Sequence, residues 1–141
     1  MQATTTSGPR WAAFALTAAT VELALTTAYI HLSLGGVLFT LNAVGFVVLS
    51  ALLAAGAIPN PLINRFSWLP RIGLAGFTAV TIGAYLVIGP YFVLGWVAKA
   101  VEVAILILLA ADVVRVYGSP VGLVRAATST FRQHERPMRT A

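Results

Sequence analysis

The chain contains no cysteine, which excludes several kinds of chemistry. Disulfide bonds, thiolate catalysis, iron–sulfur clusters and zinc–thiolate sites all need that side chain. Charge is also scarce, because charged residues make up 9% of the chain, against about 25% in an ordinary soluble domain. A soluble fold this poor in charge would lack the polar surface to cover itself. With 59% hydrophobic residues and a mean hydropathy of +0.90, the sequence predicts a protein whose solvent is a lipid bilayer.

Motifs for catalysis are missing as well. The sequence has no phosphate-binding glycine loop, no cluster with metal-ligand spacing and no hydrolase nucleophile motif. We therefore expect no enzyme activity, no cofactor and no metal. The net charge of +5 would fit a nucleic-acid partner, but the arginines flank apolar stretches, so membrane topology explains them better. We expect no nucleic-acid binding.

Four apolar stretches come close to the roughly 20 residues that a spanning helix needs. They cover residues 11–32, 36–56, 72–89 and 91–116, and the third is the shortest. The first is about 22 residues long, beyond the roughly 7–15 of a signal-peptide core, so we expect a retained anchor rather than a cleaved leader. The predicted fold class is an all-α integral membrane four-helix bundle.

The connections predict how these spans are joined. Residues 33–36 and 89–91 are minimal turns, the second containing a proline that cannot continue a helix. They predict two tight helical hairpins. The linker 57–71, with three prolines and two aromatic residues, predicts an interfacial loop with room for one short helical turn. The expected domains are an N-terminal segment at 1–10, a transmembrane domain at 11–117 and a basic tail at 118–141.

All eight arginines fall on one side of this predicted topology. They precede the first span, lie between the second and third, or follow the fourth: Arg10, Arg65, Arg71, Arg115, Arg125, Arg132, Arg136 and Arg139. Neither short turn carries a basic residue. By the positive-inside rule both termini are expected to be cytoplasmic. The predicted location is a membrane crossed several times, the inner or plasma membrane if the cell is bacterial.

The tail allows two interpretations. Ser119 and Pro120 are suited to the N-cap and first position of an amphipathic helix whose apolar face holds Val124, Ala127 and Phe131. Its flanking residues Arg125 and Arg132 would then reach anionic lipid headgroups. The alternative is a disordered basic tail, and residues 136–139 are expected to be disordered in either case.

Polar residues of all four spans are predicted to gather between the bilayer midplane and the outer third. Counted from the outer turns at about 1.5 Å per residue, their depths range from about 9 to about 16 Å. The predicted cluster holds Glu22, Asn42, Thr78, Thr81, Lys99 and Glu102. Each charged member would cost on the order of 3 kcal/mol if it faced lipid at mid-bilayer. We therefore expect these side chains to face the bundle interior, a wet cavity or a partner.

Such a cluster has two readings. The functional interpretation is a proton or cation relay, or a site for a small polar ligand. The structural interpretation is a set of polar contacts between helices that fixes their register or binds another membrane subunit. We predict a non-catalytic accessory or scaffold subunit, part of a homo-oligomer or a larger membrane complex. The alternative is a small homo-oligomeric transporter or proton-linked carrier that uses Glu22 and Glu102, with Lys99 as their modulator.

Three further residues complete the expectations. Asp112 and Arg115 lie one turn apart at the inner boundary of the fourth span and predict an interfacial ion pair. His31, at the outer end of the first span, predicts an interfacial histidine without a ligand role.

Overall fold

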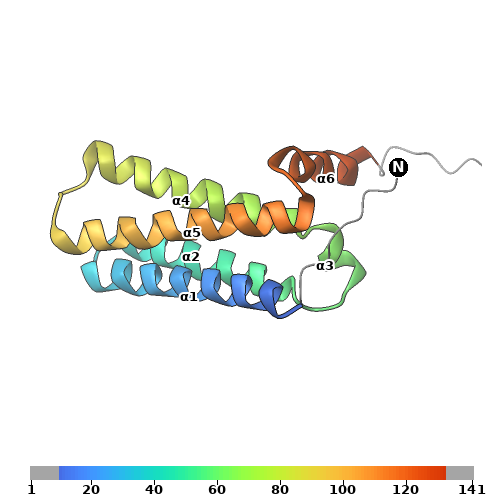
Figure 1. Ribbon diagram of the computed structural model, residues 1–141. Helices are drawn as coiled ribbons and strands as arrows, with labels where there is room; N and C mark the ends of the chain where they lie inside the picture. The colour runs from blue at the N-terminus through green and yellow to red at the C-terminus, as the bar shows by residue number, and fades with distance from the viewer. Residues whose placement is uncertain (1–9, 133–141) are drawn as a thin grey trace, which may run out of the picture.

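A computed structural model describes residues 10–132, which form six helices and no strand (Figure 1). The predicted N-terminal segment up to residue 9 and the tail residues 133–141, including the expected disorder at 136–139, lie outside the described part. The helices are α1 (Arg10–Leu34), α2 (Val37–Ala55), α3 (Pro61–Arg65), α4 (Trp68–Ile88), α5 (Val93–Tyr117) and α6 (Pro120–Arg132). Helices α1, α2, α4 and α5 are each long and apolar enough to cross a membrane.

The four long helices form a ring in which α1 packs against α2 and α5, and α4 packs against the same two helices. Helix α5 packs more extensively on α1 than on its chain neighbour α4. Each helix of the ring packs against both of its neighbours. These contacts therefore neither confirm nor contradict the predicted grouping into two hairpins, α1 with α2 and α4 with α5. We call the end with the two short connections the turn end, and the opposite end, with α3 and α6, the arginine end (Figure 1).

Both connections at the turn end depend on unusual backbone conformations. Between α1 and α2, Gly35 and Gly36 have φ of 71° and 88°, values that only glycine adopts at low cost. Between α4 and α5, Pro90 stops the helix and Tyr91 has φ of 43°. The hydroxyl of Tyr91 donates to the carbonyl of Leu86 at 2.6 Å, which ties this connection back to α4.

The long linker contains the short helix that its composition allowed. The Asn60 side chain accepts hydrogen bonds from the amides of Leu62 and Ile63 and so caps α3. The predicted start of the third span at residue 72 is wrong, because α4 begins at Trp68. Pro70 is accommodated in the first turn, where a missing amide costs nothing. At 21 residues α4 is also not the shortest span; α2, with 19, is.

Small residues let the helices approach closely around the core. Its fully buried members are Ala24, Ala28, Ala43, Phe46, Leu53, Leu74, Ile105 and Leu109. The ring of Phe46 on α2 meets the ring of Phe77 on α4 edge to face, with 5.0 Å between their centroids. Gly45 makes this possible, since a Cβ there would lie 2.4 Å from the Phe77 ring. The core therefore joins α2 and α4, which are not joined by a short turn.

The described part of the tail forms the helix α6, as the first interpretation predicts. The Ser119 hydroxyl oxygen accepts from the amide of Gly122 at 3.0 Å, as an N-cap does. The predicted apolar residues Val124 and Phe131 are exposed on α6, as a face turned toward lipid would be, and Thr130 is buried. The Arg65 guanidinium donates to the carbonyl of Thr130 at 3.1 Å. This contact turns the Thr130 face toward α3, and Val124 lies about 120° away around the helix.

Candidate intramembrane polar site

A carboxylate lies at the centre of the bundle near the turn end. Glu102 on α5 has no exposed surface. Lys99, one turn earlier on the same helix, places its Nζ 2.7 Å from Oε1 and 2.6 Å from Oε2 of that carboxylate. The ammonium is itself buried, with the residue 6% exposed. A buried pair of opposite charges at this distance avoids the cost of leaving either charge alone in a medium of low dielectric constant.

Two threonines from other helices complete the coordination of Glu102. The Thr27 hydroxyl of α1 donates to Oε1 at 3.2 Å, and the Thr81 hydroxyl of α4 lies 3.1 Å from Oε2. Each carboxylate oxygen thus has two donors within reach, one from Lys99 and one from a neighbouring helix. This arrangement joins α1, α4 and α5 through a single side chain, and it is specific because each oxygen requires its own donor.

His31 on α1 belongs to the same site. Its Nδ1 lies 2.7 Å from the carbonyl oxygen of Thr27, so Nδ1 carries a proton, an assignment made from this geometry. Its Nε2 then faces Oε1 of Glu102 at 3.7 Å. The prediction of an interfacial histidine is wrong, because the residue is 3% exposed and packs against the ring of Phe46 at 5.9 Å. Its position on the inward face of α1 determines this burial.

A cavity of about 120 Å³ connects this site to the turn end of the bundle. His31, Thr81 and Lys99 lie at its deep end, and the walls include Asn42 and Tyr85. The remaining lining residues come mostly from the helix ends near the two turns: Leu34, Leu38, Phe39, Ala84, Ile88, Gly89, Pro90, Phe92, Gly95 and Ala98. The ammonium of Lys99 lies 5.5 Å from the centre of the Tyr85 ring. The polar site is therefore buried in the helices but adjoins a small cavity.

Glu22 does not join the cluster, which corrects the sequence prediction. It is the middle residue of the 25-residue α1, and its side chain is exposed on the outside of the bundle. The inward face of α1 carries Thr20, and Glu22 lies about 200° further around the helix. Among the side chains that the structure describes, none forms a hydrogen bond or ion pair with its carboxylate. Glu102 is level with Thr27, which lies about 7 Å nearer the turn end than Glu22 does.

The other predicted members are divided between the site and its surroundings. Thr81 contacts the carboxylate, and Asn42 is half-buried in the cavity wall. Thr78 is fully buried, but its hydroxyl donates to the carbonyl of Leu74 in its own helix at 2.7 Å. The structure therefore brings Thr81, Lys99 and Glu102 together, with Asn42 nearby, and leaves Thr78 as a neighbour of the site.

The outward face of α1 around Glu22 forms a shallow groove. Thr26 and Tyr29 follow Glu22 on this face, one and two turns nearer the turn end, and both are exposed. Ala18, Val21 and Leu25 form the apolar part of the groove. The Thr26 hydroxyl donates to the Glu22 carbonyl at 2.9 Å, so it is already used within the helix. Polar groups at helical spacing thus occupy a surface that is otherwise apolar.

At the arginine end, Asp112 holds two arginines rather than one. Arg115 Nη2 lies 2.5 Å from Oδ1, the contact that its one-turn spacing predicted, and Arg71 Nε donates to Oδ2 at 2.7 Å. Arg71 also donates to the carbonyl of Ser67 at 2.5 Å. The contribution of α4 is not visible in the sequence pattern, which places Arg71 in the linker. Arg125 is exposed on α6, and Arg132 ends that helix.

Thr27 and His31 are the site residues that the sequence interpretation missed. A signal was present: Thr20, Thr27 and His31 recur at intervals of seven and four residues, the spacing of one helix face. Glu22 is out of phase with that face. The depth of a residue along its helix does not show which way its side chain faces. Depth alone therefore predicts Glu22, rather than Thr27 or His31, as the α1 member of the cluster.

The described residues contain no group of three histidine, aspartate or glutamate side chains placed to hold a metal ion. No family model, no curated protein and no solved structure matches this chain. Four helices long and apolar enough to cross a membrane, in a chain that is all-helical over the described residues, indicate a small membrane protein.

Proposed function

We propose that this protein is a non-catalytic accessory or scaffold subunit that assembles in the membrane through the outward face of α1. The single observation that carries the proposal is Glu22, an exposed carboxylate at the middle of a spanning helix. A glutamate in contact with lipid at mid-bilayer costs on the order of 3 kcal/mol. A partner helix that supplies a hydrogen-bond donor removes this cost, so the monomer gains from association at this face.

The surroundings of Glu22 support a helix as the partner. Ala18 and Val21 are small enough to let another backbone approach, as at many helix contacts in membranes. Tyr29 adds an exposed hydroxyl further along the same face. Both carboxylate oxygens of Glu102 have hydrogen-bond partners inside the bundle, whereas the carboxylate of Glu22 faces outward. In this proposal Glu102 stabilises the subunit and Glu22 binds the partner. That partner is a second copy or another membrane subunit.

We further propose that the arginine end faces the cytoplasm. Arg65, Arg71, Arg115 and Arg125 all belong to this end of the bundle, and no arginine belongs to the turn end within residues 10–132. The positive-inside rule favours such an asymmetry. Both termini would then be cytoplasmic. The exposed Val124 and Phe131 of α6, with Arg125 beside them, would contact the lipid surface on that side.

The mass of the membrane-embedded protein tests the assembly. The full chain is extracted from its native membrane with a polymer that keeps the surrounding lipid, and the particle mass is measured for wild type, Glu22→Leu and Glu22→Gln. We expect a complex in the wild type, loss of the complex in Glu22→Leu, and retention in Glu22→Gln, whose amide still forms hydrogen bonds. A monomer in all three, or an unchanged complex in Glu22→Leu, would contradict the proposal.

A second candidate function, a small proton-linked carrier, is favoured by one observation: the cavity at the turn end reaches His31, Thr81 and Lys99 beside Glu102. In this reading Glu102, rather than Glu22, exchanges the proton. Proton flux into liposomes containing the purified protein distinguishes the two. The carrier requires a flux that Glu102→Gln abolishes while Glu22→Gln leaves it intact, whereas the scaffold shows no flux above empty liposomes.

A further inference from the structure

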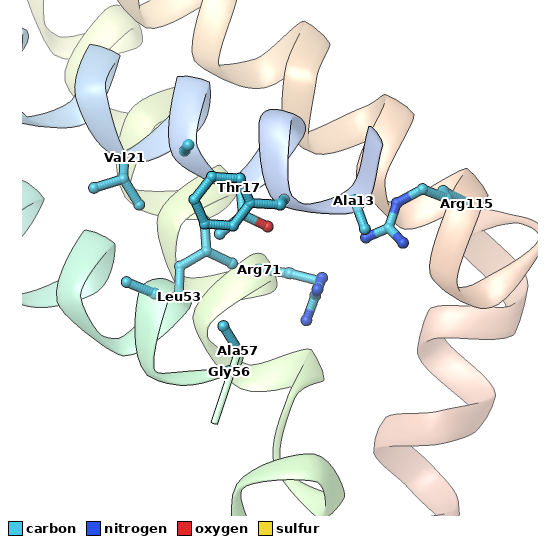
Figure 2. A pocket seen from close by; sticks show the side chains of 11 residues that line it. Ala13, Thr17, Val21, Leu53, Gly56, Ala57, Arg71 and Arg115 are labelled. Atoms are coloured by element: carbon cyan, nitrogen blue, oxygen red, sulfur yellow. The ribbon is translucent and has the colours of Figure 1, made fainter. Parts of the chain in front are cut away.

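A net positive charge lies beside a pocket at the arginine end. This pocket, of about 380 Å³, is bounded by α1, the end of α2 and the two arginines of α4 and α5 (Figure 2). Its volume lies within the roughly 300–1,000 Å³ of typical ligand pockets. Figure 2 shows the guanidinium groups of Arg71 and Arg115 at one side of it, with Ala13 and Thr17 of α1 facing them.

The arginines carry more positive charge than their shared partner neutralises. Arg71 and Arg115 both bind Asp112, so the three side chains together keep one positive charge. No acidic side chain occurs among the described residues that line the pocket. Arg115 uses only one of its N–H groups in the described contacts, and its side chain is 31% exposed, against 11% for Arg71. An anion can therefore reach Arg115 while Arg71 holds Asp112 in place.

Apart from Thr17, the rest of the pocket is apolar. Phe14, Val21 and Leu53 contribute most of the larger side chains of its wall. Phe14 is 73% exposed, so the wall continues onto the lipid-facing surface of α1. A site with guanidinium donors at one side and an apolar wall that opens sideways fits an amphiphile with an anionic head, rather than a fully water-soluble anion.

We infer that this pocket binds one anionic phospholipid, with its phosphate on Arg115 and Arg71 and the start of an acyl chain along Phe14 and Val21. The net positive charge favours a lipid such as phosphatidylglycerol over phosphatidylcholine, because no acidic group among the described lining residues is there to balance the choline cation. This site is on the opposite end of the bundle from Glu102, and it does not depend on assembly through Glu22.

Native mass spectrometry of the full-length protein in detergent, titrated with phosphatidylglycerol, phosphatidylcholine or inorganic phosphate, tests the inference. We expect one preferred phosphatidylglycerol adduct in the wild type. Arg115→Gln removes the free donor but leaves the pair of Arg71 and Asp112, and we expect it to weaken this adduct about tenfold or more. Arg65→Gln is the matched control, since it removes one positive charge from the same end outside the pocket, and it should bind as the wild type does.

A second variant separates a pocket from surface charge. Thr17→Phe fills space in the pocket and keeps both arginines, so it should also lose the adduct. Four outcomes would overturn the inference: equal binding of both lipids, equal weakening by Arg115→Gln and Arg65→Gln, unchanged binding in Thr17→Phe, or displacement of the lipid by equimolar inorganic phosphate. The last would indicate a site for a free anion instead of a lipid.

Discussion

The two faces of α1 carry similar residues in opposite environments. Inward, Thr27 and His31 meet the carboxylate of Glu102 through hydrogen bonds and close contact. Outward, Glu22, Thr26 and Tyr29 form the groove on the surface of the bundle. Both faces place polar groups one turn apart within an apolar helix. The inward groups have partners inside the subunit, and the outward carboxylate has none among the described side chains. The inward face thus stabilises the fold, and the outward face is available for assembly.

The largest effect is expected where a charge loses its partner. Lys99→Met leaves Glu102 buried without its ammonium, and we expect the free energy of unfolding to fall by about 3–5 kcal/mol. The double variant Lys99→Met/Glu102→Met, which removes both charges and keeps the volume, should recover most of this loss. Thermal or denaturant unfolding in detergent measures both.

The outward counterpart of that experiment is Glu22→Met. It removes a charge that has no partner inside the subunit. The free energy of unfolding of the detergent-solubilised monomer should therefore stay the same or rise. If Glu22→Met lowered the free energy of unfolding as much as Lys99→Met does, Glu22 would have a partner inside the subunit. The inward and outward faces of α1 would then not differ in this respect.

A smaller effect is expected at the histidine. His31→Leu puts an apolar side chain of similar size beside Phe46 and removes the donor to the Thr27 carbonyl. We expect the free energy of unfolding to fall by about 1 kcal/mol, the usual net value of one hydrogen bond. Tyr29→Leu is the outward control and should leave unfolding unchanged. If His31→Leu is neutral, the ring is a packing element only and not a functional part of the polar site.

The smallest effect is expected for the two adjacent threonines. Thr27→Val removes one hydroxyl donor from Glu102, and interhelical hydrogen bonds in membranes contribute about 0.6 kcal/mol on average. Thr26→Val removes a hydroxyl that only bonds within α1 and should be neutral for unfolding. A double-mutant cycle of Thr27→Val with Glu102→Met measures the coupling directly; no coupling would mean that the contact does not stabilise the bundle.

The sequence was enough to predict the helices, and less informative about their faces. Long apolar runs and the short turns around Gly35 and Pro90 predicted four spanning helices, since these signals are local. The pairing of Lys99 with Glu102 was local too, because the two residues are one turn apart. The placement of Glu22, His31 and Arg71 depended on which side of α1 and α4 faces the interior. That choice is made by packing of the whole ring, and it was only weakly visible in the spacing of Thr20, Thr27 and His31.

The absence of native cysteine allows a direct test of assembly through α1. A single cysteine is placed at Thr26, on the Glu22 face, or at Val44, which is also exposed, on α2, and each variant is treated in its native membrane with a short cysteine-specific photo-crosslinker. The account predicts one adduct of defined mass, with a second copy or one other subunit, at Thr26→Cys and none at Val44→Cys. Only monomer at both positions, or the same adducts at both, would contradict it.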